Sequence, residues 1–444
     1  MKLTLNEIAR KTGGALCGCD MTVTGLETDS RRVNGGCIFA AIKGARADGY
    51  DFIPSLDSID NIAYLTDRAP RSVKNPYIVV PDVIRAIGDI AALHLEKLPA
   101  KTVAVTGSVG KTTTKNFIAA ALSECMRVNF SKGNHNNELG MPLSVLETSA
   151  DDSAVVLEMG MRGFGQIKYL CGIARPDIAV ITNIGISHIE LLGSRENILK
   201  AKCEIIDALP AGGTAVLNGD DDMLQTVSTD KKTLRFGIEN ESCDIRAVNI
   251  VDNSFDMLYG GKSYKVRLAV EGRHNIYNAL AAAAVGTALG CDINRLIRGI
   301  EAFEGDGKRQ NIYEFHGLRI FDDTYNASPA SMAAAMSVMR GYDGRKVLVL
   351  ADMLELGGYS AGAHRGLAQN VRDLHASVVV CIGNEMRNLY NALGDMTAFW
   401  CADNLQARDV LMQNVRPGDN ILFKGSQSMN VAGLLKDFKG EWVR

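Results

Sequence analysis

One short stretch carries residue types that can bind nucleotide phosphates. It runs from Thr106 to Thr114 and reads TGSVGKTTT. Its two glycines let the backbone turn tightly, so that several N–H groups can face one cluster of phosphate oxygens. Lys111 adds a point charge for the terminal phosphates, and the hydroxyl of Thr112 suits a magnesium ion. The longer form of this pattern has glycine where Val105 stands, so the loop is the shorter Gly-x-x-Gly-Lys-Thr.

The segments that flank this loop must hold it in place. The apolar run 102–105 predicts a buried parallel strand, and residues 115–125 predict a helix. A strand, a glycine loop and a helix in this order favour phosphate binding, because the helix start adds the positive end of its dipole. The alternative is a glycine turn with an incidental lysine, and the required order of all the parts argues against it. The predicted ATP-binding residues of the loop are Gly107, Ser108, Val109, Gly110, Lys111, Thr112 and Thr113.

Polar residues follow several predicted strands of the same region. Runs at 153–157, 177–181 and 214–217 end next to Glu158, Asn183 and Asp220. Open α/β sheets bind ligands at the carboxyl ends of their strands, so Glu158 can share a metal ion with Thr112. The alternative for Glu158 is a carboxylate that only caps the next loop. A helix is predicted at about 194–208.

Length and composition restrict the class of protein. A chain of 444 residues is too long for one core, so two or three domains are expected. The net charge of -3 gives no basic field, so nucleic acid is not an expected partner. The ten cysteines form no C-x-x-C pair, which indicates reduced thiols rather than zinc ligands or disulfides. The polar N-terminus and the short apolar run 279–289 predict neither a signal peptide nor a membrane segment, and we expect a cytoplasmic protein.

The order of strand and helix patterns predicts an α/β protein with three domains. Residues 1–98 form a small N-terminal domain, with a helix at 3–12 and a strand at 33–41. Residues 99–312 form a central domain with a parallel sheet, followed by antiparallel strands near 243–250, 255–259 and 263–270. The flexible break Gly305-Asp306-Gly307 precedes the second boundary. Residues 313–444 alternate strands and helices again and form a second, Rossmann-like domain.

Three further sites could contact ligands. Ser30 and Arg31 suit a diphosphate or a carboxylate, although solvated loop residues are the more ordinary interpretation. Asn275 and Asn278 lie three apart near a predicted helix start, where their amides could meet an adenine edge or cap the helix. Asp323 ends the first predicted strand of the last domain, at the edge where ligands bind.

Seven motifs, taken together, resemble the Mur ligase family, the ATP-dependent amide-forming enzymes of peptidoglycan synthesis. They follow in family order as TGSVGKTTT, GNHNNELGMP, LEMGMRG, TNIGISHIELLGS, AKCEI, GRHNIYNALAA and DDTYNASPASM. DDTYNASP followed by ADMLELG is most similar to the members that add D-alanyl-D-alanine to UDP-N-acetylmuramoyl-tripeptide. The chain departs from the expected pattern at Ser328, where asparagine is usual, and at Gln166, where glutamate is usual.

The resemblance implies roles that the residues alone do not establish. Lys111 would hold the ATP phosphates, and Thr112 with Glu158 would hold one of two magnesium ions. His188 and Lys202 would serve the second ion and the chemistry, with Lys202 carbamylated by carbon dioxide, although a lone histidine or helix lysine usually has no such function. The remaining implied contacts are to the adenine by Asn275 and Asn278, to the nucleotide by Arg309 and Asp323, to the uridine diphosphate by Ser30 and Arg31, and to the muramoyl-peptide or dipeptide by Asn134, Asn136, Asn137, Tyr325, Asn326 and Ser328.

The resemblance also implies a monomer that uses ATP and Mg²⁺, activates a carboxylate as an acyl phosphate, and closes its domains around the substrates. The sequence leaves two alternative functions. One is a related ligase with another acceptor, either the third-residue-adding ligase or a folylpolyglutamate synthase, and the block DDTYNASP argues against it. The other is a nucleotide-dependent switch, which would not need a separate domain at 1–98. A purely structural protein would not place Lys111, Glu158, His188 and Asp323 at strand ends or in their loops.

Overall fold

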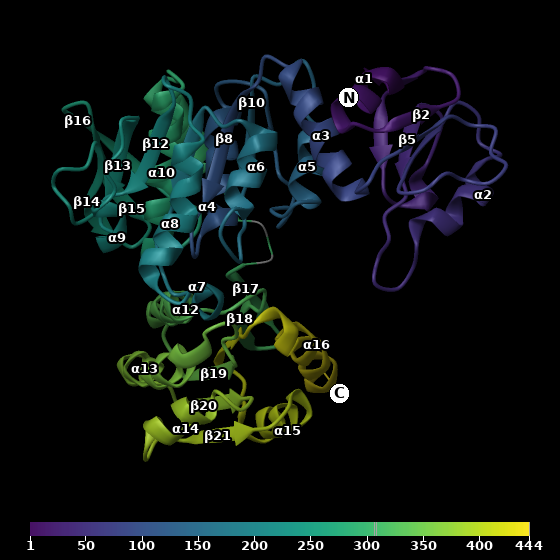
Figure 1. Cartoon of the computed structure of the whole chain (residues 1–444). Helices are drawn as coiled ribbons and strands as arrows, with labels where there is room; N and C mark the ends of the chain where they lie inside the picture. Colours follow the sequence, from purple (N-terminus) through teal and green to yellow (C-terminus); the bar gives the residue numbers. More distant parts are fainter. Residues whose placement is uncertain (306, 308, 444) are drawn as a thin grey trace.

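The structure is a computed structural model that describes residues 1–305, 307 and 309–443. It consists of three α/β domains, with the N-terminal and C-terminal domains on different sides of the central one (Figure 1). The predicted fold class is therefore confirmed. Asp306, in the break predicted to separate the last two domains, lies outside the described residues. In the described part of the chain, no helix is both long enough and apolar enough to cross a membrane.

The N-terminal domain has a sheet with strand order β2-β7-β6-β5-β4, and β1 pairs with β3 beside it. Helix α1 begins two residues later than predicted, because the Thr4 hydroxyl and the Glu7 carboxylate form a capping box at its start. The elements are β1 (Leu3–Thr4), α1 (Leu5–Thr12), β2 (Ala15–Cys17), β3 (Thr22–Val23), β4 (Gly25–Glu27), η1 (Ser30–Arg32), β5 (Cys37–Ala40), η2 (Gly49–Phe52), α2 (Ile53–Leu56), β6 (Ala63–Thr66), β7 (Tyr77–Val79) and α3 (Val83–Glu96).

The central domain is organised around a sheet with strand order β16-β15-β14-β13-β12-β11-β8-β10-β9. The strands from β9 to β14 are parallel, and β14, β15 and β16 form the predicted antiparallel section. The elements are β8 (Lys101–Thr106), α4 (Lys111–Ser123), β9 (Val128–Phe130), α5 (Gly140–Leu146), β10 (Ala154–Glu158), α6 (Gln166–Ala174), β11 (Ile178–Ile181), α7 (Ile189–Leu192), α8 (Arg195–Asp207), β12 (Thr214–Asn218), α9 (Asp222–Gln225), β13 (Lys232–Gly237), β14 (Ile245–Val251), β15 (Ser254–Tyr259), β16 (Lys262–Arg267), α10 (Arg273–Ala288) and α11 (Ile293–Glu301).

Both faces of the central sheet are covered by helices, so its strands are apolar on both sides. Val103 and Val105 of β8 pack into the core beneath α4 and α10, whereas Ala104 packs into the opposite core. This alternation is the period of a strand, and burial on both faces is typical of a parallel sheet. Helix α3 packs against α5 and α6, which attaches the N-terminal domain to the central one.

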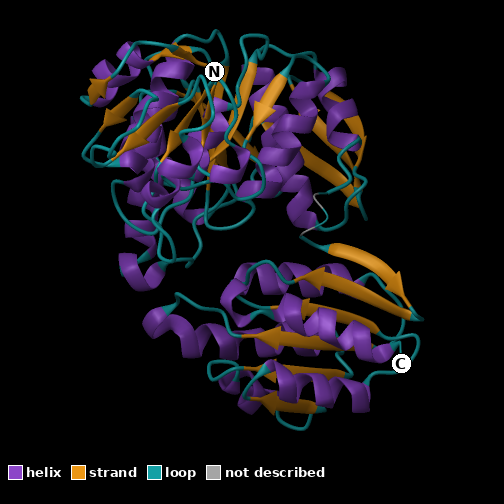
Figure 2. Ribbon diagram, turned by 90° about the vertical axis from the view of Figure 1, so that its right-hand side faces the viewer, coloured by secondary structure: helices purple, strands orange, loops and turns teal. Residues whose placement is uncertain are grey.

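The C-terminal domain is a separate sheet with strand order β17-β18-β22-β19-β20-β21 and helices on both faces (Figure 2). The elements are β17 (Asn311–Phe315), β18 (Leu318–Asp323), α12 (Pro329–Arg340), β19 (Lys346–Ala351), η3 (Gly357–Tyr359), α13 (Ser360–Asp373), β20 (Val378–Ile382), α14 (Arg387–Leu393), β21 (Ala398–Cys401), α15 (Asn404–Asn414), β22 (Asn420–Lys424), η4 (Gln427–Met429) and α16 (Val431–Trp442). Strand β17 pairs with β18 from Asn311 onward, so the predicted boundary at residue 312 falls inside this strand.

Candidate active site

The phosphate loop connects β8 to α4 and is held in place by the two residues that follow β11. Asn183 accepts from the Ser108 N–H through its carbonyl and from the Val109 N–H through its side chain, both at 3.0 Å. The Thr182 hydroxyl donates to the Val109 carbonyl at 2.6 Å. Gly110 lies in the left-handed region, with φ of 82°, where a side chain is rarely tolerated. The loop is therefore a preformed backbone cradle.

Gly107 is expected to tolerate no side chain. A Cβ at this position would lie 1.9 Å from the Thr182 hydroxyl oxygen, and φ is already 154°. We predict that Gly107→Ala displaces the loop from β11 and lowers nucleotide-dependent activity by at least about 100-fold, the size of effect that misplaced binding groups produce. The matched control is Gly163→Ala, because a Cβ there meets no atom within 4 Å. Equal steady-state rates for Gly107→Ala and wild type would contradict the cradle geometry.

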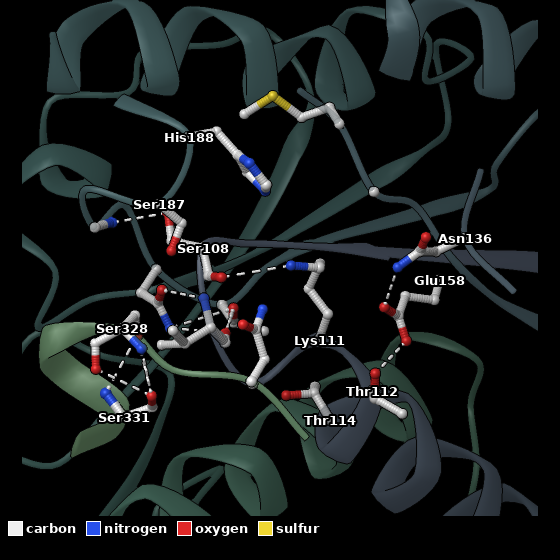
Figure 3. Close-up of a pocket in the computed structure, with 18 of the residues that line it drawn as sticks. Ser108, Lys111, Thr112, Thr114, Asn136, Glu158, Ser187, His188, Ser328 and Ser331 are labelled. Atoms are coloured by element: carbon white, nitrogen blue, oxygen red, sulfur yellow. Dashed lines mark hydrogen bonds between the residues drawn. The ribbon is translucent and has the colours of Figure 1, made fainter. Parts of the chain in front are cut away.

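Lys111 begins α4, four residues before the predicted helix start. Its Nζ donates to the carbonyl of Gly107 at 2.9 Å and lies 3.4 Å from that of Ser108, so the side chain folds back over the loop (Figure 3). Burial lowers the pKa of Lys111 below the ordinary lysine value, and the Glu158 carboxylate opposes this shift. The ammonium is thus aimed at the position that loop-bound phosphates would take.

Thr112 and Glu158 are in contact, so they lie close enough to share a metal ion, as their positions in the sequence predicted. The Thr112 hydroxyl donates to Glu158 Oε2 at 2.5 Å, and the Asn136 amide donates to Oε1 at 2.7 Å (Figure 3). Thr112 and Glu158 are buried, although they lie beside the cleft. Mg²⁺ takes oxygen ligands and is usually held by one or two carboxylates plus substrate phosphates. This pair fits such an ion, even though no three His, Cys, Asp or Glu side chains cluster as a metal site in the described residues.

His188 and Lys202 lie on the segment that follows β11. His188 precedes α7 with φ of 64° and lines the cleft. Burial lowers its pKa. Lys202 is only 2% exposed on α8, and burial, followed by the Lys111 charge, lowers its pKa well below the ordinary lysine value. A buried lysine that favours the neutral amine fits carbamylation, because only the neutral amine attacks carbon dioxide.

The two predicted adenine contacts differ in position. Asn278 lines the cleft, and its Oδ1 accepts from the Thr114 hydroxyl at 2.7 Å. Asn275 lies behind it, where its amide donates to the Glu271 carbonyl at 2.7 Å and its Oδ1 accepts from Asn278. Helix α10 is capped by Gly272, so capping is not the role of Asn275. The side chain of Asn275 positions Asn278 in this structure.

The C-terminal domain contributes the opposite wall of the cleft. Cζ of Arg309, which lies two residues before β17, is 4.2 Å from the centroid of the Tyr325 ring, and Asp323 pairs with the buried Lys424. Lys424 also donates to the Asn326 carbonyl at 2.9 Å, which ties the strand ends together. Ser328 caps α12 and shares a capping box with Ser331, which accounts for serine at this position. At the other departure, Gln166 accepts from the Arg162 N–H at 2.6 Å.

The central and C-terminal domains, together with the start of α3, line a cleft of about 1580 Å³. Of the predicted site residues, those that line it are Ser108, Val109, Gly110, Lys111, Thr112, Thr113, Asn134, Asn136, Asn137, Glu158, His188, Asn278, Arg309, Asp323, Tyr325, Asn326 and Ser328. Ser30 and Arg31 are absent from its lining, and Arg31 pairs with Asp29 at 2.6 Å on the surface of the N-terminal domain. The sequence analysis did not single out Thr182 or Lys424 as site residues. Thr182 directly follows a strand and Lys424 ends one, so both could have been found by the signal that indicated Glu158 and Asp323.

Comparisons with known proteins agree with this architecture. Three family models match, described as the Mur ligase family catalytic domain at residues 22–94, the Mur ligase middle domain at 105–286, and the Mur ligase glutamate ligase domain at 308–427. The chain is 33% identical to the UDP-N-acetylmuramoyl-tripeptide–D-alanyl-D-alanine ligase of Escherichia coli over 96% of both chains. It is 35% identical to the Bacillus subtilis enzyme of the same name over 98% of both.

Solved structures give the same result. MurF from Acinetobacter baumannii has a TM-score of 0.91 at 29% identity, covering 99% of both chains. MurF from Thermotoga maritima in complex with ADP has a TM-score of 0.82 at 29% identity, covering 94% of this chain and 97% of that one. FolC of Escherichia coli, at 19% identity and a TM-score of 0.62, shares the fold alone. The chain belongs to the Mur ligase family.

Proposed function

We propose that this enzyme adds D-alanyl-D-alanine to UDP-N-acetylmuramoyl-tripeptide with ATP as the energy source. The observation that carries the proposal is similarity along the whole chain, at 33% and 35% identity, to two ligases of that name. A relative that binds ADP in the same fold supports the use of ATP. The alternative acceptors of related ligases have less support, because FolC matches at only 19% identity.

The reaction requires that an unreactive carboxylate acquire a leaving group. Phosphoryl transfer from ATP makes the terminal carboxylate of the tripeptide an acyl phosphate and releases ADP. The amine of D-alanyl-D-alanine then attacks the carbonyl carbon, and the tetrahedral intermediate expels phosphate. Lys111 and the N–H groups of the loop neutralise charge on the transferring phosphoryl group, so the catalytic contribution of the protein is mostly positioning and electrostatic.

The residues fit two magnesium ions in different ways. Thr112 and Glu158 would hold the ion that neutralises phosphate charge. His188 and a carbamylated Lys202 would hold the other, because a carbamate supplies the anionic oxygens that magnesium accepts and an ammonium lacks. Burial of Lys202 supports this proposal, since an uncompensated ammonium is unfavourable at that depth.

The substrate would extend from the N-terminal domain into the cleft. We assign the uridine diphosphate to Ser30 and Arg31, which lie outside the cleft lining, and the peptide to Asn134, Asn136 and Asn137, which line it. Tyr325, Asn326 and Ser328 would contact the dipeptide from the C-terminal domain. Arg309 and Asp323 would then meet the nucleotide, and Asn278 its adenine, with Asn275 behind it. A cytoplasmic monomer remains a prediction.

Acceptor competition tests the proposal. The purified protein should convert UDP-N-acetylmuramoyl-tripeptide and D-alanyl-D-alanine to one product whose mass corresponds to the pentapeptide. Diaminopimelate or L-lysine with the matching dipeptide substrate, and glutamate with a folate, serve as competing reactions in the same assay. A product from either competing pair, and none from D-alanyl-D-alanine, would assign the chain to another branch of the family.

A further inference from the structure

Glu355 of the C-terminal domain lies against His188 of the central domain. Its Oε2 is 2.6 Å from His188 Nδ1, and its Oε1 is 4.0 Å from Nε of Arg162. Nδ1 is buried, and within the described part of the chain it satisfies no hydrogen-bond geometry. Glu355 therefore supplies a carboxylate next to a buried ring nitrogen, and a small rotation of either side chain would align the two.

The backbone on both sides of this contact is unusual. His188 and Glu355 have φ of 64° and 62°, values that residues with a side chain rarely adopt. Such conformations persist only where the surrounding structure enforces them, and they gather at functional sites. Here the two left-handed residues face each other across a domain boundary, which places the carboxylate and the imidazole together.

The surrounding packing holds the two segments in register. Helix α7, directly after His188, packs against η3, which begins two residues after Glu355. A Cβ on Gly357 would lie 3.1 Å from the Glu190 side chain, so the glycine permits this close approach. Ile186 packs against both the central core and the core of the C-terminal domain. The contact is thus part of a packed interface between the domains.

A carboxylate in this position has a known chemical effect on a histidine. When one ring nitrogen donates to a carboxylate, the tautomer and the ring orientation are fixed and the other nitrogen becomes a better metal ligand. We propose that Glu355 is a positioning residue that orients His188 toward the second metal ion, so that this ion binds fully only when the C-terminal domain is docked. The inference rests on the proposed function, in which His188 serves that ion.

The test is Mn²⁺ binding to the full-length protein with ADP present, with free Mn²⁺ counted by electron paramagnetic resonance. Three variants are compared with wild type: Glu355→Ala, Glu355→Gln and Glu190→Ala. The glutamine can still accept from Nδ1–H and should restore most of the binding. Glu190→Ala removes the same charge from the same interface, and Glu190 forms no ion pair with His188 in the described part of the chain, so it is the matched control.

Wild type should bind two Mn²⁺ ions. Glu355→Ala should lower the Mn²⁺ affinity of the weaker of the two sites about 10-fold or more, which is the usual loss when a metal-bound histidine lacks its partner. Glu355→Gln should lie close to wild type, and Glu190→Ala should equal it. The role of Glu355 would be overturned if Glu355→Ala bound both ions as tightly as wild type, or if Glu190→Ala lost as much Mn²⁺ affinity as Glu355→Ala. Either result would leave the two-ion proposal standing. A wild type that binds one ion would overturn both this inference and the two-ion proposal.

Discussion

Replacing Lys111 by alanine should reduce ATP-dependent ligation by at least about 1000-fold, since removing even one neutral donor from a preorganised site costs about 100- to 1000-fold. The reason is its place in the loop. Nζ folds back onto the carbonyls of Gly107 and Ser108, so the charge is held in advance over the phosphate cradle. An ammonium in a buried site interacts more strongly with phosphate than it would in water.

The same substitution should leave the fold intact. The Lys111 ammonium donates hydrogen bonds to carbonyl groups of its own loop. Burial disfavours its charged form and lowers its pKa. Removing it therefore deletes no hydrogen bond between different helices or strands in the described part of the chain. The check is a thermal melt beside the steady-state rate. Lys101→Ala is the control, because Lys101 starts the same strand at its other end and forms an exposed pair with Asp177. A near wild-type rate for Lys111→Ala would show that the phosphate loop is wrongly assigned.

Replacing Lys202 by alanine should produce the second large loss, on the order of 100-fold, with partial recovery in the presence of formate or acetate. Truncation leaves a buried space where the carbamate would supply anionic oxygens, and a small carboxylate offers the same oxygens in that space. The loss lies at the upper end of the range for partners of a metal site, about 10- to 100-fold. Because Lys202 is buried, we expect the loss of activity and its rescue to be specific to this side chain.

Chemical rescue is the measurement, with rate followed against carboxylate concentration. Lys200→Ala is the matched control, because Lys200 lies on the same helix and is exposed. It should keep the wild-type rate and show no response to acetate. A ¹³C-bicarbonate label that appears on wild type and is absent from Lys202→Ala would add direct support. No rescue at any concentration, together with no label on wild type, would contradict the carbamate.

Local patterns predicted the strands that carry the site with small errors. Strand β8 extends only one residue beyond each end of the predicted run, because an apolar strand buried on both faces has a clear sequence signal. The helix start was predicted at residue 115, yet α4 begins at Lys111. Polar threonines at a helix start resemble loop residues, so the position of Gly110, with its left-handed backbone, was the better guide.

Edge strands and contacts between domains were harder to predict. In the central and C-terminal domains, strands β9, β13, β17 and β21 were missed. Of these, β9 is an edge of the central sheet, and β17 and β21 form the edges of the C-terminal sheet, where partly exposed residues weaken the apolar pattern. Glu355 lies in the quoted segment ADMLELG, but nothing in that segment indicates that it meets His188. The two residues are separated by a domain boundary, and the packing of α7 on η3 helps to bring them together. Conversely, Ser30 and Arg31 share the predicted chemistry of the site without lining the cleft.

Phosphate release by the purified protein with ATP and Mg²⁺ tests the central proposal most directly. The complete reaction contains UDP-N-acetylmuramoyl-tripeptide and D-alanyl-D-alanine, and each is omitted in turn. We predict release that requires both substrates, one phosphate for each pentapeptide formed. Release with ATP alone at the same rate, and no product, would contradict ligation and support a nucleotide-dependent switch instead.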